Sequence, residues 1–412
     1  MHVLYFHQYF STPEGATGLR SYQMAKRLVE RGHRVTMVCA SRARGHTGAE
    51  GEAIRGIRRG HVDGIDVVEV CIPYSNYDGL VKRSMTFLRL AVRNVLIAAR
   101  TDYDLLFATS TPLTASIPGI VMRLLKPRRP FVFEVRDLWP ELPKAMGVVT
   151  NPVVLGAMSV LEWSSYRSAT RTIALSPGIE QGIRKRSRPL KAVAMIPNGC
   201  DLDMFGQNGN STADLLTELC PDTSGATLRA AFIGAHGAAN GLDAVLDAAA
   251  VLKARERTDI QLFFIGDGKT KPALVERAER EGLQNCTFLG FIPKMRLAAL
   301  MQHMHAGLMV LANVPAFYYG TSPNKFFDYI AAGMPVLNNY PGWLASLIEE
   351  HKCGLVVPPE DAEAFAEALI RLADDSEMRQ AMGVRSRRLA EQRFARDDLA
   401  NQFVDFLEGS AG

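Results

Sequence analysis

Short apolar runs alternate with helical patterns along the whole chain of 412 residues. This alternation is typical of doubly wound α/β proteins, in which parallel strands are joined by helices. The runs form two successive series, which predict two Rossmann-like domains that face each other across a cleft at the carboxyl ends of their strands. The predicted strands are 2–6, 35–39, 67–72, 105–108, 131–135 and 172–175 in the first series, and 228–233, 261–265, 286–289, 306–311, 336–338 and 354–356 in the second.

The boundary between the two domains is predicted near residues 185–200, where a basic stretch precedes the sequence IPNGCD. We therefore expect an N-terminal domain at 1–190 and a C-terminal domain at 191–385. A surface loop rich in Gly, Asn, Ser and Thr is expected at 207–226. The chain ends in a long helical pattern, from which we expect a C-terminal helix over 386–412.

The segment Ser322–Val336, SPNKFFDYIAAGMPV, has the pattern of a capped helix. Ser322 is a good N-cap residue, and Pro323 suits the first helical position. Gly333 favours the end of the helix. A helix is therefore predicted to begin directly after Ser322.

The first turn of this helix favours an anion. The backbone N–H groups of Asn324 and Lys325 lie among the unsatisfied donors of a helix start, and Lys325 adds a positive charge. Asp328 shares one helix face with them. The spacing suits a nucleotide, with phosphates at the helix tip and ribose hydroxyls on Asp328. An ordinary capped helix after a strand would have the same spacing.

Glycine-rich turns follow several predicted strands, and glycine lets the backbone approach a phosphate closely. The turn after the first strand has the spacing Gly-x-x-Gly instead of GxGxxG, and no acidic residue closes the second strand, so a dinucleotide site is not favoured. Plain strand-to-helix turns are the alternative interpretation throughout. The candidate residues in these turns are Gly15, Gly18, Gly234, His236, Asn240, Gly266 and Gly268.

Charged residues follow the predicted strand 131–135 in the sequence RDLWPE. Ligand sites of α/β proteins form at the carboxyl ends of strands. Arg136, Asp137 and Glu141 are therefore candidates for binding or catalysis. A structural ion pair between Arg136 and Asp137 is the alternative.

Composition excludes several classes of protein. The formal net charge is only +4, and no apolar run reaches the ~18 residues of a membrane span. The six cysteines are scattered without CxxC spacing, which indicates a reduced cytoplasmic protein and argues against zinc. No nucleic-acid partner is expected. The stretch 80–100 alternates basic and apolar residues, which suits either an anionic membrane surface or a core-packed helix with a solvated basic side.

Several motifs together resemble the retaining glycosyltransferases of family 4, which have the GT-B fold. They are the SPNK helix, the interdomain sequence PNGCD at 197–201, RGHRV at 31–35, IGDG at 265–268 and LGFIP at 289–293. The RDLWPE form resembles the branch that builds bacterial surface polysaccharides, including N-acetyl-L-fucosamine transferases. The resemblance covers nearly the whole chain.

The resemblance implies a final helix that crosses back to the N-terminal domain, with Phe394, Leu399, Phe403 and Phe406 as buried contacts. It implies catalytic roles for Arg136, Asp137, Glu141 and Lys325, and it implies neither a metal nor a redox cofactor. The donor-binding residues that it implies are Gly15, Gly18, Gly234, His236, Asn240, Gly266, Gly268, Phe291, Thr321, Ser322, Asn324, Lys325 and Asp328.

Three positions depart from the family pattern. His236 and Asn240 stand where the family has an arginine and a lysine that clamp the diphosphate. Lys325, the helix tip and Arg136 are therefore expected to carry more of the phosphate binding. Gly320 replaces a glutamate that contacts the donor sugar, which points to a deoxy or N-acetylated sugar. Arg136 takes the place of a histidine that contacts that sugar.

The function implied is transfer of a sugar from a nucleotide-sugar donor, UDP before GDP or dTDP, to a polyprenyl-diphosphate-linked saccharide. Such an enzyme would serve O-antigen, lipopolysaccharide, capsule or exopolysaccharide synthesis. It would be cytoplasmic and peripheral at the inner face of the plasma membrane, with helix 80–100 at the membrane surface. A GT-B nucleotide-sugar epimerase and a catalytically inactive nucleotide-sugar-binding protein are the alternatives.

Overall fold

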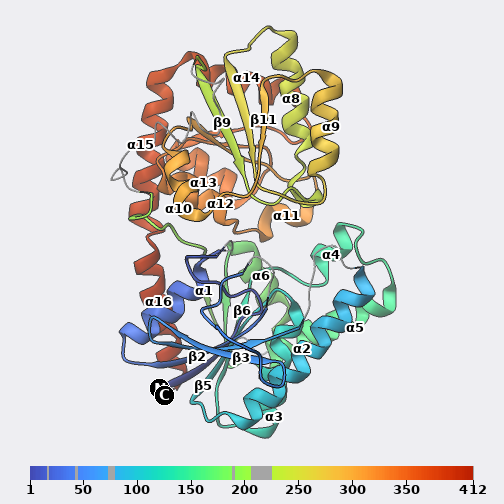
Figure 1. Cartoon of the computed structure of the whole chain (residues 1–412), viewed down its shortest axis with the longest axis vertical. Helices are drawn as coiled ribbons and strands as arrows, with labels where there is room; N and C mark the ends of the chain where they lie inside the picture. The colour runs from blue at the N-terminus through green and yellow to red at the C-terminus, as the bar shows by residue number, and fades with distance from the viewer. Residues whose placement is uncertain (16–17, 42–44, 73–78, 188–190, 206–224, 412) are drawn as a thin grey trace. The chain divides into compact units, whose positions relative to one another are not determined.

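The computed structural model describes residues 1–15, 18–41, 45–72, 79–187, 191–205 and 225–411. The chain divides into two compact units, coloured mainly blue to green and yellow to red in Figure 1. The first unit comprises Met1–Pro197, Gly320–Ser322 and the residues from Asp397 onward, and the second comprises Asn198–Tyr319 and Pro323–Arg396. Most of the loop predicted at 207–226 lies outside the described residues.

The first unit is built on one sheet in the order β3-β4-β2-β1-β5-β6-β7-β8. All neighbouring strands are parallel except β3, which pairs antiparallel with β4 at one edge. Without β3, the order is that of a doubly wound sheet, and it reverses between β1 and β5. The strands are β1 (His2–Phe6), β2 (Arg34–Ala40), β3 (Ile57–Val62), β4 (Ile65–Val70), β5 (Leu105–Thr109), β6 (Phe131–Val135), β7 (Arg171–Ala174) and β8 (Ala192–Met195).

Helices cover both faces of this sheet. Successive side chains of a strand point to opposite faces, so Val3 and Tyr5 of β1 pack under α1 and α16, whereas Leu4 and Phe6 pack under α2, α3, α5 and α6. The helices of the unit are α1 (Arg20–Glu30), α2 (Leu80–Arg100), α3 (Ile117–Leu125), α4 (Glu141–Ala145), α5 (Pro152–Ser168), α6 (Pro177–Arg186) and α16 (Arg396–Ala411), with a 3-10 turn η1 (Leu113–Ser116).

The C-terminal helical pattern is two helices, α15 (Ser376–Arg393) and α16, and not one. The helix breaks because Cys200 donates its N–H to the carbonyl of Phe394 and accepts the N–H of Arg396. Leu399, Phe403 and Phe406 of α16 pack into the core of the first unit, as expected. The expectation for Phe394 is wrong: its ring packs on Phe327 of the second unit, with centroids 5.3 Å apart.

The second unit is built on a wholly parallel sheet in the order β11-β10-β9-β12-β13-β14. This is the 3-2-1-4-5-6 order of a dinucleotide-binding fold, with its topological switch point between β9 and β12. The two parallel-sheet α/β units confirm the predicted fold class at this level. The strands are β9 (Leu228–Ile233), β10 (Ile260–Ile265), β11 (Cys286–Leu289), β12 (Ala306–Met309), β13 (Val336–Asn338) and β14 (Gly354–Val356).

The helices of the second unit leave the carboxyl ends of these strands and pack back on the sheet. α8 and α14 share one core with β9 and β10. Besides α15, the helices of this unit are α8 (Asp243–Ala254), α9 (Lys271–Glu281), α10 (Lys294–Met301), α11 (Pro315–Gly320), α12 (Asn324–Ala331), α13 (Trp343–His351) and α14 (Ala362–Asp374), with a 3-10 turn η3 (Ala238–Asn240).

All twelve predicted strands are present, with ends that differ from the prediction by at most two residues. The sequence prediction missed β3 and β8, the two edge strands of the first sheet. β3, with the sequence IRRGHV, is not an apolar run, and β8, AVAM, is apolar but only four residues long. The side chains of both strands are only half-buried or exposed. Within the described residues, no helix is long and apolar enough to cross a membrane.

Candidate functional site

The glycine turns after β9 and β10 pack against each other, backbone on backbone. A Cβ atom on Gly266 would lie 2.0 Å from the carbonyl oxygen of Gly234, and one on Gly268 would lie 2.2 Å from that of His236. Gly234 and Gly266 also have positive φ angles of 147° and 139°. These glycines are therefore needed to bring the two turns together at the switch point of the sheet, whatever ligand binds there.

α12 begins beside these turns, one residue later than predicted. Its first residue is Asn324 and its N-cap is Pro323, which has no side-chain oxygen to accept a hydrogen bond. The expectation that Ser322 caps the helix and Pro323 opens it is therefore wrong. Because Pro323 cannot cap α12 through its side chain, the N–H groups of Asn324 and Lys325 in the first turn can donate to an anion.

Lys325 is the cation at this helix start. Its Nζ donates to Oδ1 of Asn240 at 2.8 Å and lies 3.9 Å from the centroid of the Phe232 ring. Its Cε lies 3.4 Å from the position that a Cβ on Gly234 would take, so Gly234 leaves room for this side chain. Among the described residues it has no carboxylate partner, and burial lowers the pKa of Lys325 to about 7. The protein thus holds a cation whose charge an anionic ligand would complete.

His236 lies next to this lysine, fully buried between the rings of Phe232 and Phe264. Neither ring nitrogen has a hydrogen-bond partner among the described residues. Burial, together with the charges of Lys271 and Lys325, lowers the pKa of His236 to about 4 against the opposing effect of Asp267. The imidazole is therefore neutral. Buried polar groups usually have partners, so these nitrogens indicate a place where a ligand supplies one.

Asp328 is already paired, which the sequence analysis did not foresee. Its carboxylate accepts from Nζ of Lys294 at 2.5 Å, and the residue is only 6 % exposed. The Nζ of Lys294 also lies 5.2 Å from the centroid of the Phe205 ring. A ribose hydroxyl that binds Asp328 would therefore share this carboxylate with Lys294. The only signal in the sequence is a lysine directly after the LGFIP segment.

The predicted residues of the first unit gather where β5 and β6 end. The N–H of Arg136 donates to Oγ of Ser110 at 2.8 Å, and its guanidinium lies 3.4 Å from Nε2 of His7, after β1. The carboxylate of Asp137 accepts from the hydroxyl of Thr111 at 3.0 Å. Arg136 and Asp137 thus have separate partners, and a mutual ion pair is not their main contact.

Thr111 has a strained backbone, and Asp137 is desolvated. Thr111 has a φ of 92°, an unusual value for a β-branched residue, and such strain clusters at functional sites. Burial raises the pKa of Asp137, against the hydrogen bond from Thr111 and the charge of Arg136. Glu141 is exposed at the start of α4 and lies outside this half-buried group.

A buried ion pair supports the end of β6 and was missed by the sequence analysis. Arg20 and Glu134 are 1 % and 0 % exposed and are joined by hydrogen bonds of 3.0 and 2.8 Å. Arg20 also donates to the carbonyls of Ile196 and Pro197. Burial alone would raise the pKa of Glu134, but the charge and hydrogen bonds of Arg20 hold it below its usual value. The pair ties the start of α1 to the sheet.

The glycine loop before α1 has a packing role. A Cβ on Gly15 would lie 1.9 Å from Oγ of Ser11 and 2.9 Å from the backbone nitrogen of His46, so only glycine fits there. Gly18 is exposed just before α1, and residues 16–17 lie outside the described residues. The donor roles of both glycines stay predictions.

The remaining predicted donor residues lie at the edge of the second unit's site or near α12. Phe291 is 45 % exposed, after β11. Thr321 and Ser322 are half-buried in the segment before α12. Asp201, which forms a D-x-D sequence with Asp203, is engaged in an ion pair with Arg396.

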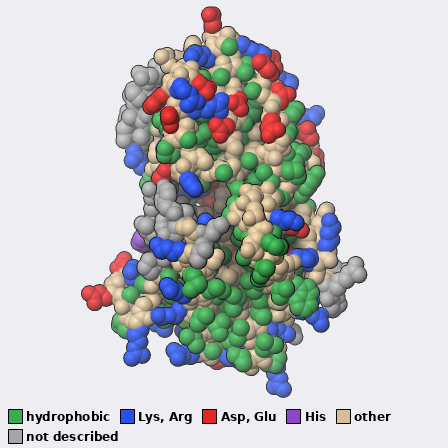
Figure 2. Space-filling view, turned by 90° about the vertical axis from the view of Figure 1, so that its right-hand side faces the viewer, with side chains coloured by type: hydrophobic (Ala, Val, Ile, Leu, Met, Phe, Trp, Pro, Cys, Tyr) green, Lys and Arg blue, Asp and Glu red, His purple; other side chains and the backbone are tan. Residues whose placement is uncertain are grey.

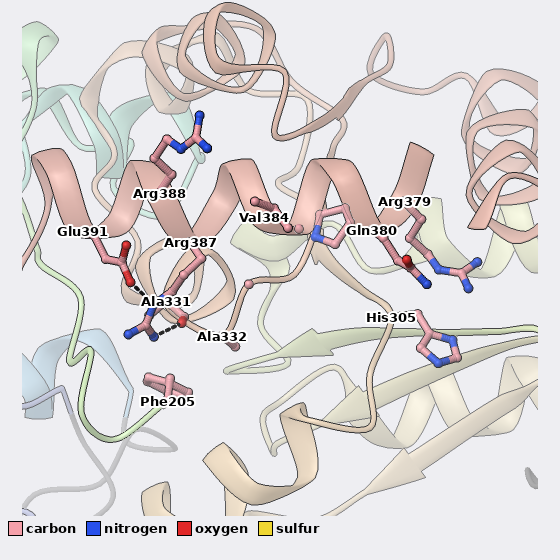
Figure 3. A pocket seen from close by; sticks show the side chains of 13 residues that line it. Phe205, His305, Ala331, Ala332, Arg379, Gln380, Val384, Arg387, Arg388 and Glu391 are labelled. Carbon is pink, nitrogen blue, oxygen red and sulfur yellow. Dashed lines mark hydrogen bonds and ion pairs between the residues drawn. The ribbon is translucent and has the colours of Figure 1, made fainter. Parts of the chain in front are cut away.

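A pocket of about 850 Å³ lies at the opposite end of α12 from Lys325 (Figure 3). Eight residues of helix separate the two places by roughly 12 Å. Arg387, which points to the C-terminal end of α12 in Figure 3, donates to the carbonyl of Ala331 and pairs with Glu391. Arg379 donates to the carbonyls of Leu372 and Ala373. Arg379 and Arg387 thus hold the fold together, and the predicted donor residues do not line this pocket.

Comparison with protein families assigns each half of the chain. Residues 15–199 match the family model "Glycosyl transferase 4-like domain", and residues 226–389 match "Glycosyl transferases group 1". The first match covers most of the segment Met1–Pro197 of the first unit, and the second match covers most of the second unit.

Two of the relatives with curated names are mannosyltransferases. The chain is 26% identical over 175 residues to the O-antigen chain mannosyltransferase C of Escherichia coli, which is 42% of this chain and 44% of that protein. It is 28% identical over 163 residues to a GDP-mannose-dependent alpha-(1-6)-phosphatidylinositol monomannoside mannosyltransferase of Mycobacterium tuberculosis, which is 38% of this chain and 41% of that protein. The matched part thus spans less than half of the length of these relatives.

Solved structures share the fold over almost the entire chain. Sucrose-phosphate synthase from Thermosynechococcus elongatus superposes with a TM-score of 0.74 at 18% identity, covering 99% of this chain and 98% of that one. Anabaena Alr3699/HepE in complex with UDP superposes with a TM-score of 0.70 at 18% identity, covering 99% and 100%. With two glycosyltransferase domains in this order and this fold, the chain belongs to the GT-B glycosyltransferases of family 4.

Proposed function

We propose that the protein transfers a sugar from a nucleoside diphosphate donor to a saccharide acceptor, with retention of the anomeric configuration. The observation that carries the proposal is the site at the switch point of the second sheet. There, Lys325 has no carboxylate partner among the described residues, and it stands at an uncapped helix start beside the unpartnered imidazole of His236. A diphosphate supplies both the negative charge and the hydrogen-bond acceptors that this arrangement lacks.

The nucleotide that we propose is UDP. Supporting this choice, the LGFIP segment follows β11 at the edge of the same site, and the Anabaena protein of the same fold is described in complex with UDP. The mannosyltransferase relative that depends on GDP-mannose makes GDP the competing nucleotide. We propose an N-acetylated or deoxy sugar because Gly320 offers no carboxylate where the family has a sugar-binding glutamate.

In the proposed mechanism, Lys325 and the N–H groups of α12 stabilise the negative charge that develops on the leaving diphosphate. A donor phosphate oxygen takes the proton of the attacking hydroxyl on the same face of the sugar. Arg136 and Asp137 orient the acceptor and the sugar, since a well-placed hydroxyl removes much of the entropic barrier. Their positions are fixed by Ser110 and Thr111. Glu141 would contact the acceptor from the exposed start of α4.

The acceptor that we propose is a polyprenyl-diphosphate-linked saccharide used in surface-polysaccharide synthesis. This agrees with the relative that acts on O-antigen chains. Such an acceptor is presented at the inner face of the plasma membrane, so we propose that the protein acts there as a peripheral cytoplasmic enzyme. The basic helix of residues 80–100, now α2, is the element predicted to meet that surface.

The experiment is to incubate the purified protein with UDP-, GDP- and dTDP-sugars, with and without a synthetic polyprenyl-diphosphate saccharide. Mass spectrometry detects the extended acceptor, and NMR of the new anomeric proton distinguishes retention from inversion. We expect product from one nucleotide series only, and strong loss of turnover in Lys325→Met. Conversion of the donor sugar without an acceptor would identify an epimerase, and binding without any conversion would identify an inactive binding protein.

A further inference from the structure

The outer faces of α2, α3 and α5 carry most of the exposed apolar side chains of the described structure. Of 17 large apolar side chains that are exposed there, ten lie on these three helices. The helices lie on one face of the first sheet, with α3 in contact with both of the others. Figure 2 looks onto this side of the molecule, and green side chains gather over it.

α2 presents a complete apolar row to the outside. Met85, Leu88, Val92 and Leu96 recur at helical spacing and are 46 to 60 % exposed. The opposite side of the helix is also apolar, with Leu90 in the core of the unit. A helix on the surface of a globular protein normally has one apolar face and one polar face. α2 therefore has a second apolar face that the fold does not cover.

α5 and the end of α3 carry further exposed apolar side chains beside this row. Val153, Val160 and Trp163 of α5 share one side and are 78, 63 and 52 % exposed. Leu124 and Leu125 close α3 and are 79 and 64 % exposed. We call these residues, with the apolar row of α2, the α2–α3–α5 surface. Monomeric proteins rarely expose so many contiguous apolar side chains without a partner.

The border of this surface is basic. Residues 80–100 contain five basic and no acidic residues, and Lys82, Arg89, Arg93 and Arg100 recur at spacings that place them in a second row beside the apolar one. Arg128, which is exposed, follows the end of α3, whereas the Nζ of Lys126 is engaged by the carbonyls of Ala98 and Thr101. Figure 2 shows blue side chains around the green ones. The partner must therefore be apolar at its centre and negative at its edge.

We propose that the α2–α3–α5 surface docks on an anionic lipid bilayer, with Trp163 and the aliphatic side chains at the acyl boundary and the basic row of α2 at the lipid phosphates. Amphipathic helices with Trp or Leu beside Lys and Arg bind such interfaces. A second copy of the chain fits worse, because a two-fold interface would bring the basic rows of the two copies together. The inference extends the sequence prediction, which involved residues 80–100 alone.

This inference rests on the proposed function only in that a lipid-linked acceptor gives the docking a use. The test requires no turnover. Purified protein is sedimented with vesicles of phosphatidylcholine and with vesicles that contain roughly one third phosphatidylglycerol, at low and at high salt. The variants are Val160→Glu/Trp163→Glu in the apolar part and Arg89→Glu/Arg100→Glu in the basic row. Val384→Glu, which changes a 60 % exposed valine of the second unit, is the matched control.

We expect binding to the anionic vesicles only, reduced at least about tenfold by each pair of changes and by high salt, and unchanged by Val384→Glu. Trp163 fluorescence should shift to the blue on binding. UDP affinity, measured on the same preparations, reports that each variant is folded and keeps failure of the proposed function separate. Absence of vesicle binding by the wild-type protein would overturn the inference. A dimer in light scattering that the Val160→Glu/Trp163→Glu change dissociates would also overturn it, in favour of self-association.

Discussion

Replacing Lys325 by methionine should stabilise the protein while it weakens nucleotide binding. Burial lowers the pKa of Lys325 from 10.5 to about 7. Such a fall corresponds to roughly 5 kcal/mol against the charged form, and for a half-buried side chain we reduce it to about 2 kcal/mol. The unfolded chain keeps the higher pKa, so this penalty is fully present below pH 7 and disappears as the pH rises toward 10.5.

Lys325→Met removes the penalty, so its midpoint of thermal unfolding should exceed that of the wild type by a few degrees at pH 6, and by less at pH 9. Its affinity for UDP in calorimetry should fall by about 30- to 150-fold, since a charge-assisted contact worth about 2–3 kcal/mol is lost. Lys271→Met is the matched control. The Nζ of Lys271 donates to the carbonyls of Gly266 and Leu289, so its loss should lower the unfolding midpoint at both pH values. A Lys325→Met protein that is less stable and binds UDP normally would refute the reasoning.

Three further predictions concern pH, the first unit and metals. UDP affinity of the wild type should fall by up to about tenfold per pH unit above pH 7, because binding requires protonated Lys325, and calorimetry in two buffers at pH 8 should show uptake of nearly one proton. Constant affinity from pH 6 to 9 would contradict this. Arg20→Met should destabilise the first unit by about 3–5 kcal/mol in urea unfolding, because Glu134 loses its buried partner. The double variant Arg20→Met/Glu134→Gln should recover part of this loss. An Arg20→Met protein with the wild-type free energy of unfolding would show that the ion pair does not stabilise the fold. Turnover should persist in EDTA, since Lys325 and the helix start carry the charge stabilisation, and loss of turnover that Mg²⁺ restores would contradict it.

The fold was largely predictable because both sheets are parallel and buried on both faces. Their central strands contain continuous apolar runs, such as residues 3–6 and 105–108, which stand out from the helical patterns around them. The edge strand β3 was missed because it is only partly buried and contains two arginines and a histidine. The edge strand β8 is apolar but has only four residues, which is short for a pattern to be recognised. The break between α15 and α16 could not be foreseen, because the backbone of Cys200, about 195 residues away, makes it.

The candidate site was predictable where it depends on local pattern. The helix of Lys325 and the glycine turns before it were recognisable from spacing alone, although the helix begins at Asn324 without a side-chain cap. The contacts of Lys294 with Asp328, of Arg20 with Glu134 and of His7 with Arg136 join residues that are 34 to 129 positions apart. Such pairs are set by strand order, which a single sequence does not specify.

The most direct test of the donor site is hydrogen exchange of the backbone amides with and without UDP. We predict protection in two segments of the second unit, the turn of residues 232–241 and the helix start at 322–329, where Lys325 meets Asn240. Residues 379–391, which line the pocket of Figure 3, should exchange as before. Protection confined to residues 379–391, with 232–241 and 322–329 unchanged, would place the nucleotide at the wrong end of α12 and contradict the account.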